Sequence, residues 1–151
     1  MKHKTLGIFI IYLSCFVSPL HAAETENSNT GLIIQDAWIA EAPPVSKVMV
    51  AYMTIKNTGS TAIEIIQAES ESYSSIEFHE TVHEDGMARM IRHNSLKIPA
   101  GSKLELKRGG PHFMLFNPVR AFRASDTVSI NLTTKDNNIK TITVTVKTAQ
   151  F

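Results

Sequence analysis

Apolar and polar residues alternate in short runs along most of this chain of 151 residues. The clearest runs extend from Val128 to Leu132 and from Ile142 to Val146, and the polar segment 135–138 separates them. A period of two residues is typical of a half-buried β-strand, and a polar break between two such runs predicts a turn. The two runs are therefore predicted to form a β-hairpin.

Similar runs occur earlier in the chain. A first strand is expected from Leu32 to Trp38, because Pro43 and Pro44 soon interrupt strand pairing. The segments 48–56 and 62–68 are rich in β-branched residues and flank the turn formers 57–60, so we expect them to form a second hairpin.

The middle of the chain predicts a third hairpin. Residues 75–80 alternate, with Phe78 on one face and His79 on the other, and 87–92 return after the turn residues Asp85 and Gly86. A further strand is expected at 112–116. Since no window shows a sustained helical period, the sequence predicts an all-β sandwich or barrel.

Length and charge limit the classes of protein. A chain of 151 residues is long enough for a single domain with a real core. The 15 Lys and Arg are scattered among 14 Asp and Glu, and the formal net charge is +1. No basic stripe indicates nucleic acid as a partner.

The N-terminus has the layout of a secretory signal peptide. Basic residues precede an apolar run that is too short to span a membrane, and small residues follow it. We expect residues 1–23 to be the signal, cleaved near Ala22 or Ala23, with 24–31 as a flexible lead-in and 32–151 as the folded domain. An uncleaved anchor and lipidation at Cys15 are the alternatives. Because Cys15 is the only cysteine, the mature domain is expected to contain no thiolate and, after cleavage, no membrane span.

Candidate metal chemistry lies between residues 79 and 114. Ten residues separate His79 from Met90, 21 more lead to His112, and Met114 follows two positions later. Alternation places His112 and Met114 on one strand face, about 6.6 Å apart. Two imidazoles and two thioethers form a soft, neutral ligand set that favours copper(I) over zinc, calcium or magnesium.

Each of these residues also has an ordinary structural interpretation. Met90 and Met114 could fill gaps in the core. His79 and His112 could be surface or hydrogen-bonded histidines. The glycines before His112 supply a tight loop, either for close approach of a metal or simply as a turn.

The sequence resembles the periplasmic copper chaperones of the PCu(A)C type (DUF461-like), whose signature is a His, a Met and a His-x-Met at these spacings. The resemblance extends through most of the mature chain, from about Asp36 to Val146. It is carried by Ala42-Pro43-Pro44, Ala51-Tyr52-Met53-Thr54-Ile55-Lys56-Asn57-Thr58-Gly59, Phe78-His79-Glu80, Ile98-Pro99-Ala100-Gly101, Leu104-Glu105-Leu106-Lys107-Arg108-Gly109-Gly110 and His112-Phe113-Met114-Leu115.

The resemblance implies a cupredoxin-like, Greek-key β-sandwich that binds copper(I) through His79, Met90, His112 and Met114. It also implies delivery of copper in the periplasm toward the dinuclear copper centre of cytochrome c oxidase. The acceptor would be a Sco-type protein or cytochrome c oxidase subunit II. The sequence itself leaves the oligomeric state open between a monomer and a metal-bridged dimer, because two chains could share a metal at the surface.

The chain departs from the family pattern at two places. Many members carry a methionine shortly after the first ligand histidine, where this chain has Val82-His83, so His83 is a candidate auxiliary ligand. The His- and Met-rich C-terminal extension of some members is missing. Met87 and His93 could assist weakly.

Three other functions compete with a carrier. The domain could be an exported interaction module with incidental histidines and methionines, or a protein of copper storage or resistance. A copper enzyme is disfavoured because redox cycling normally needs more imidazoles. No hydrolase motif is present in the sequence, so we expect no enzymatic activity.

Overall fold

The structure, a computed structural model, describes residues 31–149. The predicted signal peptide and all of the predicted lead-in except Gly31 lie outside the described residues. Within 31–149 every regular element is a strand, which confirms the all-β prediction. No helix in that range is long and apolar enough to cross a membrane.

The strands follow one another with short connections. They are β1 (Leu32–Ala40), β2 (Val48–Asn57), β3 (Ile63–Glu69), β4 (Tyr73–Glu84), β5 (Met87–His93), β6 (Leu96–Ile98), β7 (Lys103–Leu106), β8 (Pro111–Pro118), β9 (Thr127–Thr134) and β10 (Ile139–Lys147).

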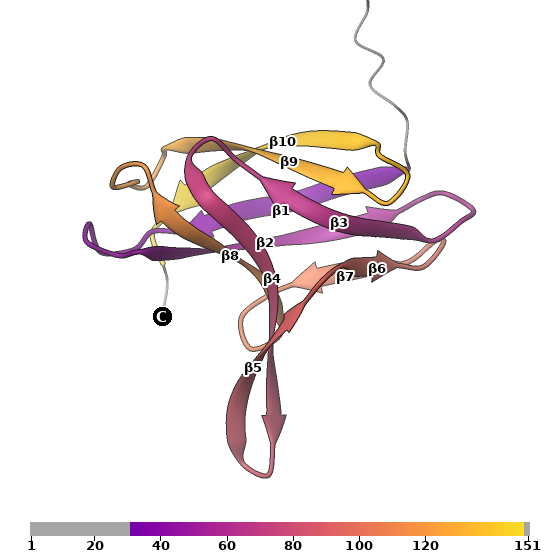
Figure 1. Ribbon diagram of the computed structural model, residues 1–151, viewed down its shortest axis with the longest axis horizontal. Helices are drawn as coiled ribbons and strands as arrows, with labels where there is room; N and C mark the ends of the chain where they lie inside the picture. Colours follow the sequence, from indigo (N-terminus) through magenta and orange to yellow (C-terminus); the bar gives the residue numbers. More distant parts are fainter. Residues whose placement is uncertain (1–30, 150–151) are drawn as a thin grey trace, which may run out of the picture.

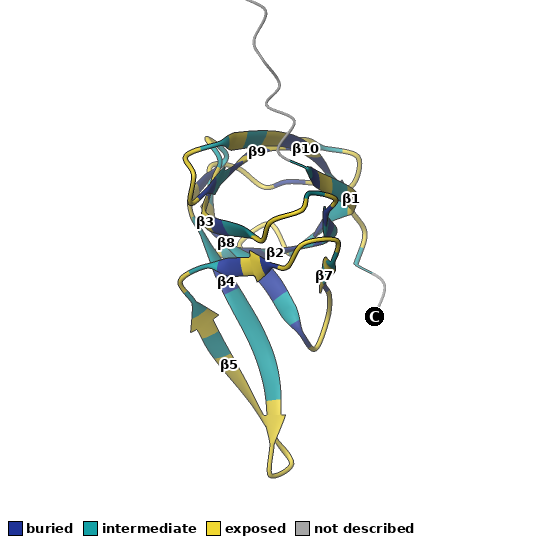
Figure 2. Ribbon diagram, turned by 90° about the vertical axis from the view of Figure 1, so that its right-hand side faces the viewer, coloured by how far each residue is buried: buried dark blue, intermediate teal, exposed yellow. Residues whose placement is uncertain are grey.

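All the strands belong to one strongly curved sheet, in the order β5-β4-β8-β2-β1-β10-β9-β3-β6, and β7 pairs with β2 beside β8. The sheet curls over so that β9 and β10 form a layer opposite β2 and β8 (Figures 1 and 2). The β4–β5 hairpin projects away from this two-layered body (Figure 1). Its position leaves β5 at one edge of the sheet.

The core lies between the two layers and follows from the alternation of residues. In β2, for example, every second residue from Met49 to Asn57 is buried. The largest fully buried apolar side chains come from both layers: Phe113, Ile39, Ile55, Ile65, Ile98, Leu115, Ile130 and Leu132. A period of two thus places one face of each strand inside and leaves the other for solvent or a site.

Two of the three predicted hairpins are confirmed. β9 and β10 pair antiparallel, with Ile130 opposite Ile142, and β4 and β5 pair from Phe78 opposite His93 to the turn at Asp85 and Gly86.

The predicted hairpin of segments 48–56 and 62–68 is wrong. Both strands form, but β2 has β1 on one edge and β7 and β8 on the other, while β3 pairs with β6 and β9. The buried Asn57 amide explains the redirection. Its Nδ2 donates to Thr61 O (2.7 Å) and to Ile98 O (3.0 Å), so it ties the connection to the end of β6 and not to a β2–β3 ladder.

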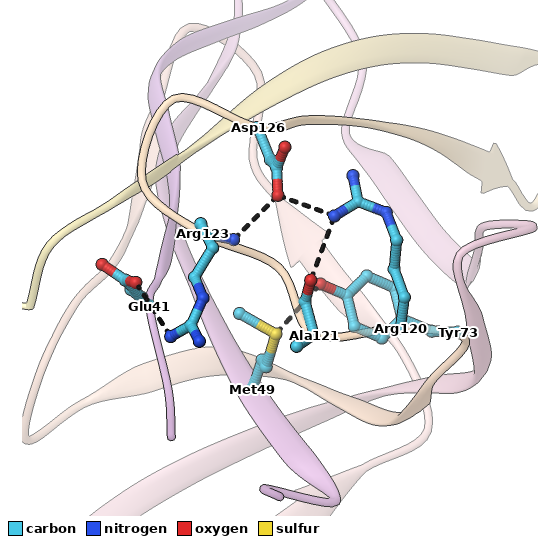
Figure 3. A network of polar contacts seen from close by, with 7 residues as sticks. All are labelled: Glu41, Met49, Tyr73, Arg120, Ala121, Arg123 and Asp126. Atoms are coloured by element: carbon cyan, nitrogen blue, oxygen red, sulfur yellow. Dashed lines mark hydrogen bonds and ion pairs between the residues drawn. The ribbon is translucent and has the colours of Figure 1, made fainter. Parts of the chain in front are cut away.

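Polar contacts fix the loop between β8 and β9 (Figure 3). The Asp126 carboxylate accepts hydrogen bonds from Arg120 Nη1 (2.8 Å) and from the Arg123 N–H (2.7 Å). These two bonds hold the pKa of Asp126 below its ordinary value. Arg123 also lies 3.7 Å from the Glu41 carboxylate, which links this loop to the segment after β1.

Candidate metal site

The two candidate histidines face each other across neighbouring strands. β4 and β8 are antiparallel partners, and His79 is the register partner of His112. The two ring centroids lie 6.3 Å apart, with 31° between the ring planes. Residues that are 33 positions apart in the sequence are thus brought side by side.

Both histidines lie on the outer face of the sheet. The preceding pair in the register, Phe78 and Phe113, is buried in the core with ring centroids 5.1 Å apart. Because successive strand residues point to opposite faces, His79 and His112 point away from the core. His112 is nevertheless only 6% exposed, so its ring is covered by neighbouring groups on this outer face.

The two candidate methionines lie on the same face, on either side of the histidine pair. Met114 is opposite Glu77, two residues before His79 in β4, and Met90 is opposite Thr81, two residues after His79. Met90 is 52% exposed, and Met114 is partly exposed. Neither side chain belongs to the buried core, so filling a core gap does not explain either methionine.

The turn before β8 orients the His112 ring. Gly110 O accepts a hydrogen bond from His112 Nδ1 at 2.9 Å and another from the Thr81 N–H at 3.2 Å. A carbonyl can only accept, so Nδ1 carries the proton and the lone pair of this ring lies on Nε2. The glycine-rich segment is therefore a turn that also fixes a histidine.

A carboxylate orients the His79 ring. His79 Nε2 lies 2.9 Å from Glu77 Oε2, and Glu77 Oε1 lies 3.5 Å from Arg92 Nη1. His79 Nδ1 is buried and has no hydrogen-bond partner among the described residues. Buried polar atoms almost always have a partner, so this nitrogen requires an explanation.

The sequence did not predict the two groups that orient the histidines, the Glu77 carboxylate and the Gly110 carbonyl. Alternation already placed Glu77 on the face of His79, and this position two residues away was the available signal. The hydrogen bond itself depends on side-chain conformations, and no sequence pattern marked the Gly110 carbonyl.

The other histidines and Met87 lie apart from this group. His83 is on the same face but is exposed and opposite Ala88, about 13 Å from His79 at the usual strand rise. His93 pairs with Phe78, so it lies on the other face, where Glu80 Oε2 is 2.8 Å from its Nε2. Met87 also belongs to that other face.

The donor set of the described residues restricts the metals that fit. Within 31–149 no three His, Cys, Asp or Glu side chains are grouped to hold a metal ion. The thioethers of Met90 and Met114 lie on the same face as His79 and His112, and thioethers suit copper(I).

Comparison with known proteins supports a single family. The family model described as LpqE-like, for LpqE-like lipoproteins, matches residues 32–146. A protein of Leifsonia xyli subsp. xyli, named as lipoprotein Lxx21020, is 33% identical over 150 residues, which cover 97% of this chain and 89% of the relative.

Solved structures show the same fold. The solution structure of CuI-DR1885 from Deinococcus radiodurans has a TM-score of 0.65 and 31% identity, over 83% of this chain and 85% of that chain. The copper-bound PCuAC domain from PmoF2 has a TM-score of 0.66 and 18% identity, over 79% and 94% of the two chains. The second likeness concerns the fold alone, and it confirms the predicted cupredoxin-like β-sandwich. The chain belongs to the LpqE-like family of PCuAC-type proteins, as the resemblance in its sequence predicted.

Proposed function

We propose that this protein is an exported copper carrier that binds one copper(I) ion through His79, Met90, His112 and Met114. The observation that carries the proposal is the state of the two facing imidazoles. Each ring has one nitrogen held by an acceptor, Gly110 O or Glu77 Oε2, which leaves the other nitrogen free to bind a metal. Histidine ligands of metals are typically oriented in this way by a carbonyl or a carboxylate.

A relative supports the identity of the metal. DR1885, which shares 31% identity with this chain, has a solved structure with Cu(I). The soft, neutral donor set on the outer face of β4, β5 and β8 agrees with this case.

The donor set also favours a carrier over an electron-transfer protein. Blue-copper sites depend on a thiolate ligand, and the chain has a single cysteine, at position 15, outside the proposed domain. Two imidazoles and two thioethers are neutral ligands, so the copper(I) site would keep a net positive charge and would lack the thiolate of a blue-copper site. Enzymatic activity is not part of the proposal.

Exposure of the site favours delivery by ligand exchange. Met90 is 52% exposed and sits on the edge strand β5, so an incoming thiolate can approach the metal from this side. The acceptor proposed is a thiol-containing protein on the path to the dinuclear copper centre of cytochrome c oxidase, such as a Sco-type protein or subunit II.

Export belongs to the same proposal. The sequence of residues 1–23 has the layout of a signal peptide, and a relative with 33% identity is named as a lipoprotein. We place the mature protein in the periplasm with its folded domain at 32–151. Lipidation at Cys15 is the alternative mode of processing.

A competitive copper(I) titration of the purified chain tests the site. The parent should bind one copper(I) per chain, and His112→Ala and Met114→Ala should each weaken binding by about tenfold or more, since each removes a ligand. His93→Ala and Met87→Ala are matched controls, because both residues lie on the other face of the β4–β5 hairpin. They should bind like the parent.

Equal affinity in the parent and both ligand variants would remove the site assignment. Absence of stoichiometric binding by the parent would favour an interaction module instead. The loaded parent is then mixed with a copper-free dithiol acceptor. Transfer of the metal supports a carrier, whereas retention would indicate storage.

A further inference from the structure

The surroundings of His79 differ from those of the other histidine–carboxylate pair of the hairpin. His93 and Glu80 form a pair at 2.8 Å in which both side chains are more than one-third exposed. The His79 side chain is only 14% exposed and that of Glu77 only 25%. The His79–Glu77 hydrogen bond is therefore more shielded from water than the other pair.

The direction of this hydrogen bond fixes the proton of the His79 ring. An ionised carboxylate can only accept, so Nε2 is the donor to Glu77 Oε2. In a neutral imidazole the lone pair then lies on Nδ1, the buried atom that has no partner among the described residues. A metal ion at Nδ1 would satisfy this atom, whose unpaired burial otherwise has a cost.

The ring of His112 has the opposite arrangement. Its Nδ1 donates to Gly110 O, so its lone pair lies on Nε2. The two register partners thus present different ring nitrogens, although both lie on the same face of the sheet.

Both oxygens of the Glu77 carboxylate contact protein groups, so Glu77 is better suited to accept a hydrogen bond than to bind the metal. Its Oε2 is engaged by His79, and its Oε1 lies 3.5 Å from Arg92 Nη1, on the register partner of His79 in β5. Carboxylate oxygens are also poor ligands for copper(I). The carboxylate therefore suits an outer role behind the histidine.

We propose that Glu77 is a positioning residue that keeps the proton of His79 on Nε2, so that His79 binds copper(I) through Nδ1 while His112 binds it through Nε2. The identity of the metal rests on the proposed function. The tautomer of His79 does not, because it is a property of the metal-free chain.

Long-range ¹H–¹⁵N correlation spectra of the metal-free, ¹⁵N-labelled chain at neutral pH test the tautomers directly. His79 should be protonated on Nε2 and His112 on Nδ1. Addition of copper(I), which is diamagnetic, should shift the ¹⁵N resonances of His79 Nδ1 and His112 Nε2 and leave both N–H protons in place. A metal-free parent with His79 protonated on Nδ1 would overturn the inference.

Substitutions then test the role of Glu77. Glu77→Ala should mix the two tautomers of His79 and weaken copper(I) binding by roughly 10- to 100-fold. Glu77→Gln retains an oxygen that can accept from Nε2, so it should restore part of both properties. Glu80→Ala is the matched control on the same strand, and it should alter only the His93 tautomer.

The outcomes separate this inference from the proposed function. If the parent binds copper(I) but Glu77→Ala leaves the His79 tautomer and the affinity unchanged, Glu77 has no positioning role and the carrier remains. If the parent does not bind copper(I), the proposed function and the ligand role of His79 Nδ1 both fail.

Discussion

At the level of single residues, the hydrogen bonds of a histidine distinguish a candidate ligand from a surface residue better than the residue type does. His79 and His93 each contact a glutamate, and both lie within one hairpin. Only His79 combines that contact with a buried nitrogen that has no partner in the described part of the chain. This difference distinguishes a candidate ligand from an ordinary surface pair.

Tyr73 carries a prediction about stability at high pH. Its hydroxyl is buried beside Met49, 3.4 Å from the sulfur (Figure 3). Burial disfavours the phenolate and raises the pKa of Tyr73 from 10.0 to about 12. Above pH 10 the unfolded chain loses this proton while the folded chain keeps it, so the free energy of unfolding should fall as the pH rises from 10 to 12.

Urea unfolding at pH 8, 10 and 11 measures this effect. Tyr73→Phe should change the free energy of unfolding at pH 8 by no more than about 1 kcal/mol, and its decline above pH 10 should be shallower than that of the parent. Parallel declines in the two proteins would show that Tyr73 does not contribute to the alkaline loss.

At the scale of elements, the turn between β7 and β8 connects backbone conformation to the site. Gly109 has φ = 72°, a conformation that residues with a Cβ rarely adopt. The turn closes with a hydrogen bond from Lys107 N to Pro111 O (2.7 Å), and it presents the Gly110 carbonyl to His112. A change at Gly109 should therefore act on the ring of His112 without touching it.

Gly109→Ala should lower the free energy of unfolding by about 1–2 kcal/mol through backbone strain, and it should also weaken copper(I) binding. Gly110→Ala is the control. Gly110 does not have a positive φ, and an added Cβ would make only ordinary contacts, the nearest at 3.6 Å from Lys107 Cγ. Thermal unfolding and copper(I) titration of both variants check this pair, and equal losses in both would contradict the role of the backbone conformation.

Alternation predicted the elements better than their neighbours. The period of two located β4, β9 and β10, whereas turn and breaker residues indicated β5 and β8. Alternation then assigned the faces of residues, because a side chain's face depends only on its own strand. Alternation did not predict that β7 and β8, and not β3, pair with β2. That pairing depends on contacts such as the hydrogen bond from Asn57 Nδ2 to Ile98 O, which joins residues 41 positions apart.

The same limit applies to the candidate site. The His-x-Met pattern was enough to place His112 and Met114 on one face. The register that sets His79 opposite His112 depends on how β4 and β8 pair, and the Glu77 and Gly110 contacts depend on side-chain conformation. That His79, Met90, His112 and Met114 form one copper(I) site was implied by the family resemblance and remains a prediction.

At the scale of the whole molecule, the candidate site lies away from the centre of the sandwich. The layers of the curled sheet (Figures 1 and 2) enclose an apolar core, whereas the candidate ligands lie on the outer face of β4, β5 and β8. Only the edge strand β5 lies beyond β4. A candidate site near one accessible edge of the sheet suits the proposed transfer of a metal ion to a partner.

X-ray absorption at the copper edge of the copper(I)-loaded chain tests the proposed four-ligand site. We expect one copper(I) per chain with two nitrogen and two sulfur scatterers, from His79, His112, Met90 and Met114. Since the proposed mature domain contains no cysteine, any sulfur neighbour in the processed chain must come from methionine. A copper coordination sphere without sulfur would rule out Met90 and Met114 as ligands.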